Sequence, residues 1–186
     1  MNNQASLDKL VGKSLIYSYA CSPFIKRLFE ADKNLEQKSI EHISHPFSRQ
    51  EMESWLDAKK TLNEIDLNKS LRKLRQHVIA NIILRDLNQL AHLDEVLKSV
   101  TALAEVVLNH AHQFHFEVLK SMHGSPIGFN GEEQHLSIVG MGKLGGEELN
   151  VSSDIDLIFA YPEEGDTNGK ESISNQSFLK VIFYHS

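Results

Sequence analysis

The sequence predicts an α+β protein, with a helical first part and a turn-rich second part that contains strands. Glycine is unevenly distributed: only Gly12 precedes residue 124, and the other nine glycines follow. Apolar residues recur at three- to five-residue steps through most of residues 6–119, which places them on one face of a helix. Two short apolar runs then flank a glycine-rich turn, a pattern typical of strands. We therefore expect a helical domain over residues 1–123 and a second domain over residues 124–186.

Short helices are expected at the start of the chain. Residues 6–21 carry a helical apolar stripe. Pro23 suits the first turn of the next helix, because a proline there removes no intrahelical hydrogen bond. Ser48 and Glu51 have the spacing of a capping box, so a further helix should begin at this point. We expect that helix to continue through Leu62.

Two long amphipathic helices follow, over about residues 67–90 and 93–119, whereas residues 31–47 are only weakly patterned. The second long helix and its end carry four histidines. These histidines lack the i, i+4 spacing that directs two imidazoles at one metal ion, so we interpret them as helix-surface residues. They are His110, His112, His115 and His123.

Composition narrows the class of protein. The net charge of −6 argues against broad nucleic-acid binding. No apolar run approaches the roughly 18 residues of a membrane helix, and the first twenty residues lack a signal-peptide layout. The single cysteine, Cys21, cannot form an internal disulfide, which is consistent with a reducing compartment. We expect a cytoplasmic protein that binds neither membrane nor nucleic acid.

The chemistry is concentrated in residues 137–161. We expect a strand ending at Val139, a glycine-rich turn, and a second strand over about residues 153–160. Asp154 and Asp156 would project from one face of the second strand, because side chains alternate with a period of two. Two adjacent carboxylates repel each other unless a cation lies between them, and Mg²⁺ prefers such oxygen ligands. Backbone N–H groups and one positive charge stand upstream, at Gly142, Lys143, Gly145 and Gly146.

This segment has two alternative interpretations. Residues 140–145 match the Gly-x-Gly-x-x-Gly pattern of dinucleotide-binding proteins. Only seven residues separate Gly146 from Asp154, however, which is too few for the crossover helix that parallel strands require. The structural alternative is a turn and an edge strand with two solvent-facing aspartates.

The longer string resembles a known family. Residues 140–150 read Gly-Met-Gly-Lys-Leu-Gly-Gly-Glu-Glu-Leu-Asn, and residues 152–159 read Ser-Ser-Asp-Ile-Asp-Leu-Ile-Phe. Together with residues 71–87, they closely resemble the bacterial bifunctional glutamine synthetase adenylyltransferase/adenylyl-removing enzymes. These belong to the nucleotidyltransferase superfamily, which includes DNA polymerase beta. The version with Asn150 looks like the N-terminal, adenylyl-removing half.

The resemblance implies a reaction and its residues. Members of this half remove AMP from a tyrosine of adenylylated glutamine synthetase by phosphorolysis and release ADP. By resemblance, Asp154 and Asp156 hold Mg²⁺ and are the catalytic pair. The remaining residues implied in the site bind phosphate or nucleotide (Gly145, Gly146, Ser153 and, by its charge, Lys143) or hold the turn (Glu148 and Asn150). The partners implied are adenylylated glutamine synthetase, phosphate, ADP and ATP.

One departure from the family pattern bears on activity. The third carboxylate of the superfamily, expected in a Val-Asp-x-Arg-Leu-Arg-Pro-like segment, does not occur before Ser186. We therefore expect a truncated N-terminal fragment with a partial nucleotidyltransferase-type mixed sheet, weakly active or inactive alone. Residues 132–186 should be partly ordered or prone to aggregation, because a cut sheet exposes a strand edge. The regulatory region between the two halves is also missing, and whether the PII nitrogen-signalling protein contacts this segment is left open.

Two other functions remain as hypotheses. A non-catalytic docking module would bind glutamine synthetase without Mg²⁺ and independently of Asp154. A dinucleotide-binding domain would be stabilised by NAD without a divalent ion.

Overall fold

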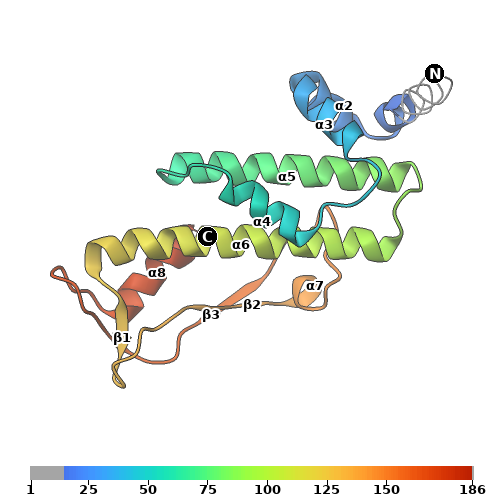
Figure 1. The fold of residues 1–186 in the computed structure, drawn as a ribbon. Coiled ribbons are helices and arrows are strands. Elements are labelled where there is room, and N and C mark those ends of the chain that lie inside the picture. Colours follow the sequence, from blue (N-terminus) through green and yellow to red (C-terminus); the bar gives the residue numbers. More distant parts are fainter. Residues whose placement is uncertain (1–14, 186) are drawn as a thin grey trace. The chain divides into compact units, whose positions relative to one another are not determined.

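The structure, a computed structural model, describes residues 15–185, and side chains through Ile182 (Figure 1). The chain divides into two compact units, Met1–Leu103 and Ala104–Ser186. Within the described residues, the long helices come before residue 124 and every strand comes after it, so the α+β class is confirmed. The division between the units falls inside helix α6 (Leu93–His123), whereas the change in secondary structure follows His123, where the sequence predicts it.

The first unit is helical in all its described elements. Residues 15–21 are helical, and residues 6–14 of the first expected helix lie outside the described part. The elements that follow are α2 (Pro23–Ala31), α3 (Lys33–Glu41), α4 (Arg49–Asp57), α5 (Glu64–Leu87) and the first turns of α6. No helix in the described part of the chain is long and apolar enough to cross a membrane.

Helix starts follow the predicted caps. The Ser22 hydroxyl oxygen accepts a hydrogen bond from the Ile25 N–H at 3.3 Å, and Pro23 begins α2. The capping box at α4 is confirmed: Ser48 Oγ accepts from the Glu51 N–H at 3.2 Å, and Glu51 Oε2 accepts from the Ser48 N–H at 2.7 Å. The backbone N–H of Ser48, followed by its hydroxyl, lowers the pKa of the Glu51 carboxyl.

Two helices, α3 and α4, differ from the expectation. Helix α3 lies in the weakly patterned stretch, where Asp32 Oδ1 caps it by accepting from the Leu35 N–H at 3.0 Å. Leu35 is its only large apolar residue that is fully buried, so periodicity alone could not reveal the helix. Helix α4 stops at Asp57, and Leu62 is 69% exposed. The chain is redirected because Asn63 caps α5 through the N–H of Asp66, at 2.9 Å.

A small core holds the first helices together. Its buried members are Ile25, Phe29, Leu35, Ala80 and Leu84. Beside this core, the buried Arg85 side chain of α5 makes a two-pronged pair with Glu95, from Nε to Oε1 at 2.7 Å and from Nη2 to Oε2 at 2.9 Å. Arg85 also donates to the Ile43 carbonyl at 2.7 Å and to the Leu90 carbonyl at 2.9 Å. One guanidinium therefore joins α5, the start of α6 and the loop after α3.

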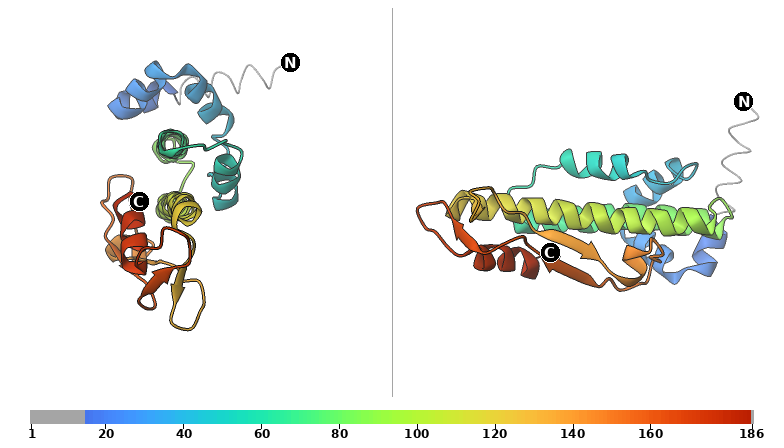
Figure 2. Two further views of the ribbon diagram at one scale, coloured as in Figure 1. Left: turned by 90° about the vertical axis from the view of Figure 1, so that its left-hand side faces the viewer. Right: turned by 90° about the horizontal axis from the view of Figure 1, so that it is seen from below.

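The second unit combines the rest of α6 with short strands and two further helices. They are β1 (Pro126–Gly128), β2 (Ser137–Gly140), α7 (Gly142–Gly145), β3 (Leu157–Ala160), β4 (Gly165–Thr167) and α8 (Asn175–His185). Residues 175–185 form helix α8, although the apolar pattern of residues 175–184 fits a helix and a strand equally. The core of this unit consists of Phe116, Leu119, Phe178, Leu179 and Ile182. Figure 2 shows β2 and β3 lying side by side along the second half of α6.

The strands do not form the expected mixed sheet. In the described residues they make two separate antiparallel ribbons, β1 with β4 and β2 with β3. The connection between β2 and β3 contains only the single helical turn α7 (Gly142–Gly145), whereas parallel strands are usually joined by a full crossover helix.

Candidate active site

The glycine turn and the aspartate pair meet at one end of the β2–β3 ribbon. The ribbon pairs Ser137 with Ala160 and Gly140 with Leu157. One step further, the N–H of Met141 donates to the carbonyl oxygen of Asp156 at 2.9 Å. The turn that follows Met141 therefore starts directly beside the backbone of Asp156.

The two aspartates precede β3 instead of lying within it. The strand begins at Leu157, and residues 153–156 are not in a strand, so the expected start at Ser153 is wrong. The physical reason is that β2 ends at Gly140 and turns into α7, which leaves residues 153–155 without a partner strand. Asp154 and Asp156 are exposed, and neither carboxylate makes a hydrogen bond or ion pair with any described residue. Ile155, which a regular strand would place on the face opposite the two aspartates, is 39% exposed.

Close backbone approach shapes the glycine turn. A Cβ on Gly145 would lie 2.4 Å from the carbonyl oxygen of Gly140, so only glycine fits against the end of β2. Gly142 has a φ of +54°, which starts the single turn of α7. The N–H of Gly145 donates to the Met141 carbonyl at 3.3 Å, and that of Gly146 to the Gly142 carbonyl at 3.0 Å. The backbone N–H groups of Gly145 and Gly146, which the resemblance implies in phosphate binding, therefore already donate within the turn in this conformation.

A second turn links α7 to the aspartates. Asn150 Oδ1 accepts from both the N–H and the hydroxyl of Ser152, each at 3.1 Å. The Ser153 N–H donates to the Asn150 carbonyl at 3.1 Å, and Ser153 Oγ accepts from the Asn150 N–H at 3.4 Å. Asn150 therefore holds the backbone just before Asp154, and Ser153 lies against it. Sequence reasoning missed Ser152, which gives no signal beyond its place in the matched string.

The charged residues near the turn are open to solvent. Lys143, in α7, is exposed and forms no hydrogen bond or ion pair with the described residues. Glu148 is also exposed, and its N–H donates to the Lys143 carbonyl at 2.7 Å, which closes the end of α7. Two buried side chains, Leu144 and Leu149, hold the segment between β2 and the aspartates against the protein interior.

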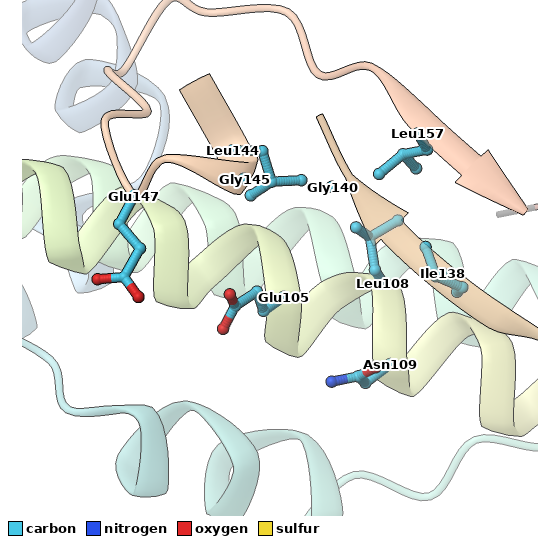
Figure 3. Close-up of a pocket in the computed structure, with 9 residues that line it drawn as sticks. All are labelled: Glu105, Leu108, Asn109, Ile138, Gly140, Leu144, Gly145, Glu147 and Leu157. Carbon is cyan, nitrogen blue, oxygen red and sulfur yellow. The ribbon is translucent and has the colours of Figure 1, made fainter. Parts of the chain in front are cut away.

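A pocket of about 300 Å³ lies behind the glycine turn (Figure 3). Glu105 and Asn109 reach it from α6, and Glu147 follows α7. Gly140 and Gly145 line it, whereas Asp154 and Asp156 do not. Two carboxylates at its rim disfavour an anion in this pocket, because like charges repel. The sequence gives only a weak signal for Glu105 and Asn109, which are polar positions four residues apart on a largely apolar helix.

The donor set fits a hard divalent cation at the end of the ribbon. Asp154 and Asp156 supply two solvent-facing carboxylates, and Mg²⁺ in proteins takes one or two carboxylates together with substrate phosphates and water. The alternative of a dinucleotide-binding unit is wrong, because β2 and β3 are antiparallel and that unit needs parallel strands.

An α+β fold with a glycine turn beside a pair of exposed aspartates is typical of nucleotidyltransferases. Comparison with known proteins agrees: the family model described as glutamate-ammonia ligase adenylyltransferase matches residues 12–183. The chain belongs to this family.

Curated relatives cover most of the chain. Three relatives, each a bifunctional glutamine synthetase adenylyltransferase/adenylyl-removing enzyme, come from Nitrosomonas eutropha, Aromatoleum aromaticum and Neisseria meningitidis. The identities are 45% over 163 residues, 41% over 170 and 46% over 129, covering 85%, 91% and 69% of this chain. The matched regions are only 18%, 18% and 14% of the relatives' own lengths. The chain thus spans less than a fifth of these larger enzymes.

Proposed function

We propose that this chain contributes to an enzyme that regulates glutamine synthetase by removing AMP from its adenylylated tyrosine. The observation that carries the proposal is the Met141–Asp156 hydrogen bond, which brings the glycine turn beside the aspartate pair. The names of the relatives support glutamine synthetase as the partner. The removing activity, as distinct from the attaching one, follows from the resemblance of the string that contains Asn150.

The proposed reaction is a phosphorolysis. An oxygen of inorganic phosphate attacks the phosphorus of the tyrosine-linked AMP, and the bond between phosphorus and the tyrosine oxygen breaks. The tyrosine oxygen takes up a proton, and the products are unmodified tyrosine and ADP. Phosphoryl transfer of this kind depends mainly on positioning and on stabilising negative charge.

Each residue of the site has a proposed part in this reaction. Asp154 and Asp156 hold Mg²⁺, which when bound stabilises the charge that develops on the phosphoryl oxygens. Lys143 adds positive charge from the exposed side of α7. Ser153 offers a hydroxyl beside the aspartates, while Asn150 fixes the backbone on which Ser153 and Asp154 stand. Gly145 keeps the turn close to β2, and Gly146 lies at its open end.

The proposal is tested in a chimera. This chain would replace the matching segment of the Nitrosomonas eutropha relative, and ADP release from adenylylated glutamine synthetase would be measured with phosphate and Mg²⁺. We expect ADP release to fall at least about 100-fold with Asp154→Asn/Asp156→Asn, because a preorganised charge clamp on a transferring phosphoryl group is lost. Asp166→Asn, at an exposed aspartate of β4, is the matched control and should leave the rate unchanged.

Measuring the attachment of AMP in the same chimera separates the two halves. If the double variant lost attachment and kept ADP release, the segment would belong to the other activity. If both activities survived, the aspartates would not be catalytic. The segment would be a docking module under one further outcome. In that outcome, replacing both aspartates leaves ADP release unchanged, and the chimera binds glutamine synthetase equally well without Mg²⁺. The 186-residue chain by itself is expected to show little or no ADP release.

A further inference from the structure

A second cluster of metal-ligand side chains lies in the helical unit. His42 and His45 are in the loop after α3, and Glu51 is in the first turn of α4. One ligand atom from each residue lies within 4.8 Å of the other two, and no other group of three His, Cys, Asp or Glu residues in the described chain does so. The cluster is separate from Asp154 and Asp156, which belong to the other unit.

The three side chains converge without forming hydrogen bonds to one another. Glu51 Oε1 lies 3.8 Å from His42 Nε2 and 3.7 Å from His45 Nε2, which exceeds the 2.7–3.2 Å of an N–H···O hydrogen bond. Around a tetrahedral ion with bonds of about 2.0–2.2 Å, ligand atoms lie about 3.3–3.6 Å apart. A movement of a few tenths of an ångström would therefore bring Glu51 and each histidine to the spacing of metal ligands.

One of the candidate ligand atoms is a buried nitrogen that lacks a hydrogen-bond partner among the described residues. His42 Nε2 is buried from water and has no hydrogen-bond partner among the described residues. A buried polar atom without a partner costs stability, so such an atom in a folded protein calls for an explanation. A bound cation would supply the missing partner directly.

The rest of each ligand is already held in place. Ser48 donates its N–H and its hydroxyl to Glu51 Oε2, both at 2.7 Å, which leaves Oε1 to face the histidines. The ring of Phe47 stacks on His42 with centroids 3.9 Å apart. Ser44 Oγ lies 3.0 Å from His45 Nδ1, so the contact of that nitrogen leaves Nε2 for the cluster. Partners of this kind, which orient the ligands from behind, are characteristic of metal sites.

The loop that carries the histidines is also fixed by α5. The fully buried Asn81 donates from Nδ2 to the carbonyls of His42 at 2.9 Å and His45 at 3.3 Å. Arg85 donates to the carbonyl of Ile43 between them, and Glu95 neutralises its charge. The two histidines are therefore presented by a backbone with a defined geometry. The His45 and Glu51 side chains are 54% and 41% exposed, which gives an ion a path of entry and room for a water ligand.

We propose that His42, His45 and Glu51 bind one divalent transition-metal ion, with Zn²⁺ favoured. Two imidazoles and one carboxylate suit zinc and disfavour Mg²⁺ and Ca²⁺, which prefer ligand sets made of oxygen. The ion would tie the loop after α3 to the start of α4.

The test is a Zn²⁺ titration of the full 186-residue chain, measured by calorimetry. A second titration with Co²⁺ in place of Zn²⁺ is measured by visible absorption. All proteins carry Cys21→Ser, which removes the only thiol. We expect one ion per chain and a rise in melting temperature that EDTA reverses. Replacing both histidines by glutamine should weaken the Kd at least about 100-fold, since it removes two of three protein ligands. His92→Gln, at an exposed histidine outside the cluster, should not change the Kd.

Glu51→Gln separates metal binding from folding. Glutamine also serves in a capping box, so α4 keeps its cap while the anionic ligand is lost. We expect the Kd to weaken at least about tenfold with the helical circular dichroism unchanged. Wild-type binding no tighter than that of the double-histidine variant, or a Kd insensitive to Glu51→Gln, would overturn the proposal and leave an ordinary cluster of side chains.

Discussion

At the scale of single residues, the neighbouring glycines Gly145 and Gly146 differ in whether packing requires a glycine at that position. Gly145 stands where its missing Cβ would meet the Gly140 carbonyl oxygen at 2.4 Å. The nearest atom to a Cβ on Gly146 is the Gly142 carbonyl oxygen at 3.4 Å, an ordinary contact, and its φ of −88° suits any residue. The first glycine is therefore required by packing, whereas the second is not. A requirement for Gly146 would have to come from something outside the chain, such as a phosphate.

Alanine substitution tests this difference. We expect Gly145→Ala to lower the free energy of unfolding by about 1–3 kcal/mol, because the added methyl forces backbone atoms apart. Gly146→Ala should change it by less than about 0.5 kcal/mol. Urea denaturation of both variants provides the measurement. Equal losses at the two positions would contradict this account of the turn, and lost ADP release in a folded Gly146→Ala chimera would indicate a ligand contact.

At the scale of elements, the second half of α5 is buried on nearly every side, with residues 78–82, 84 and 85 all buried, so the single apolar face predicted for this helix is not seen there. Its apolar stripe and its length are visible in the sequence, and the observed bounds, Glu64–Leu87, lie close to the expected ones. Asn81 and Arg85 are buried as well, and both donate to loop carbonyls more than 35 residues away in sequence, at His42, His45 and Ile43. The helix therefore acts as the frame on which the loop after α3 is fixed.

Arg85 should dominate the stability of this frame. Arg85→Ala is expected to cost about 3 kcal/mol, because it removes four hydrogen bonds and leaves Glu95 without its partner. Arg72→Ala, at an exposed arginine of the same helix, should cost less than about 0.5 kcal/mol. Thermal unfolding followed by circular dichroism compares the two. Similar melting temperatures for both variants would show that the Arg85 network contributes little.

At the scale of the whole molecule, the second unit exposes more strand edge than a closed sheet would. Its strands form two-stranded ribbons. Bridges to Glu133 and Ser174 partly cover the outer edges of β1 and β4, whereas no described strand pairs with the outer edge of β2 or β3, which leaves backbone groups there available for pairing. Val139 and Ile158 are register partners, and they are 47% and 50% exposed. An apolar pair beside open edges favours association between chains.

We predict concentration-dependent self-association through this ribbon. Val139→Lys/Ile158→Glu should reduce it, because the variant replaces the apolar pair with charges of opposite sign across the strands. Sedimentation velocity at several concentrations measures the effect, and Leu62→Glu, at an exposed leucine far along the sequence, serves as the control. A monomeric wild-type chain at high concentration, with slow hydrogen exchange throughout residues 132–182, would contradict the prediction.

Local patterns account for what could be predicted from the sequence. Caps such as Ser48 with Glu51 involve residues three positions apart, so the chain itself encodes them. The string with Asp154 and Asp156 is also local in the sequence, so its resemblance to the family is visible without the fold. Helix α3 was missed because it buries little apolar surface, and the start of β3 was misplaced because pairing ends where β2 turns away.

By itself, the sequence determined the α+β class, the long helices before residue 124 and the existence of a strand on each side of the glycine turn, and it nominated the residues of the candidate site. Only the tertiary structure decided that the strands form two separate ribbons, that Met141 meets Asp156, and that His42, His45 and Glu51 converge. Periodicity and caps act within a few residues, so they can be read along the chain. Pairing and convergence depend on which distant surfaces pack together, and no local pattern fixes that choice.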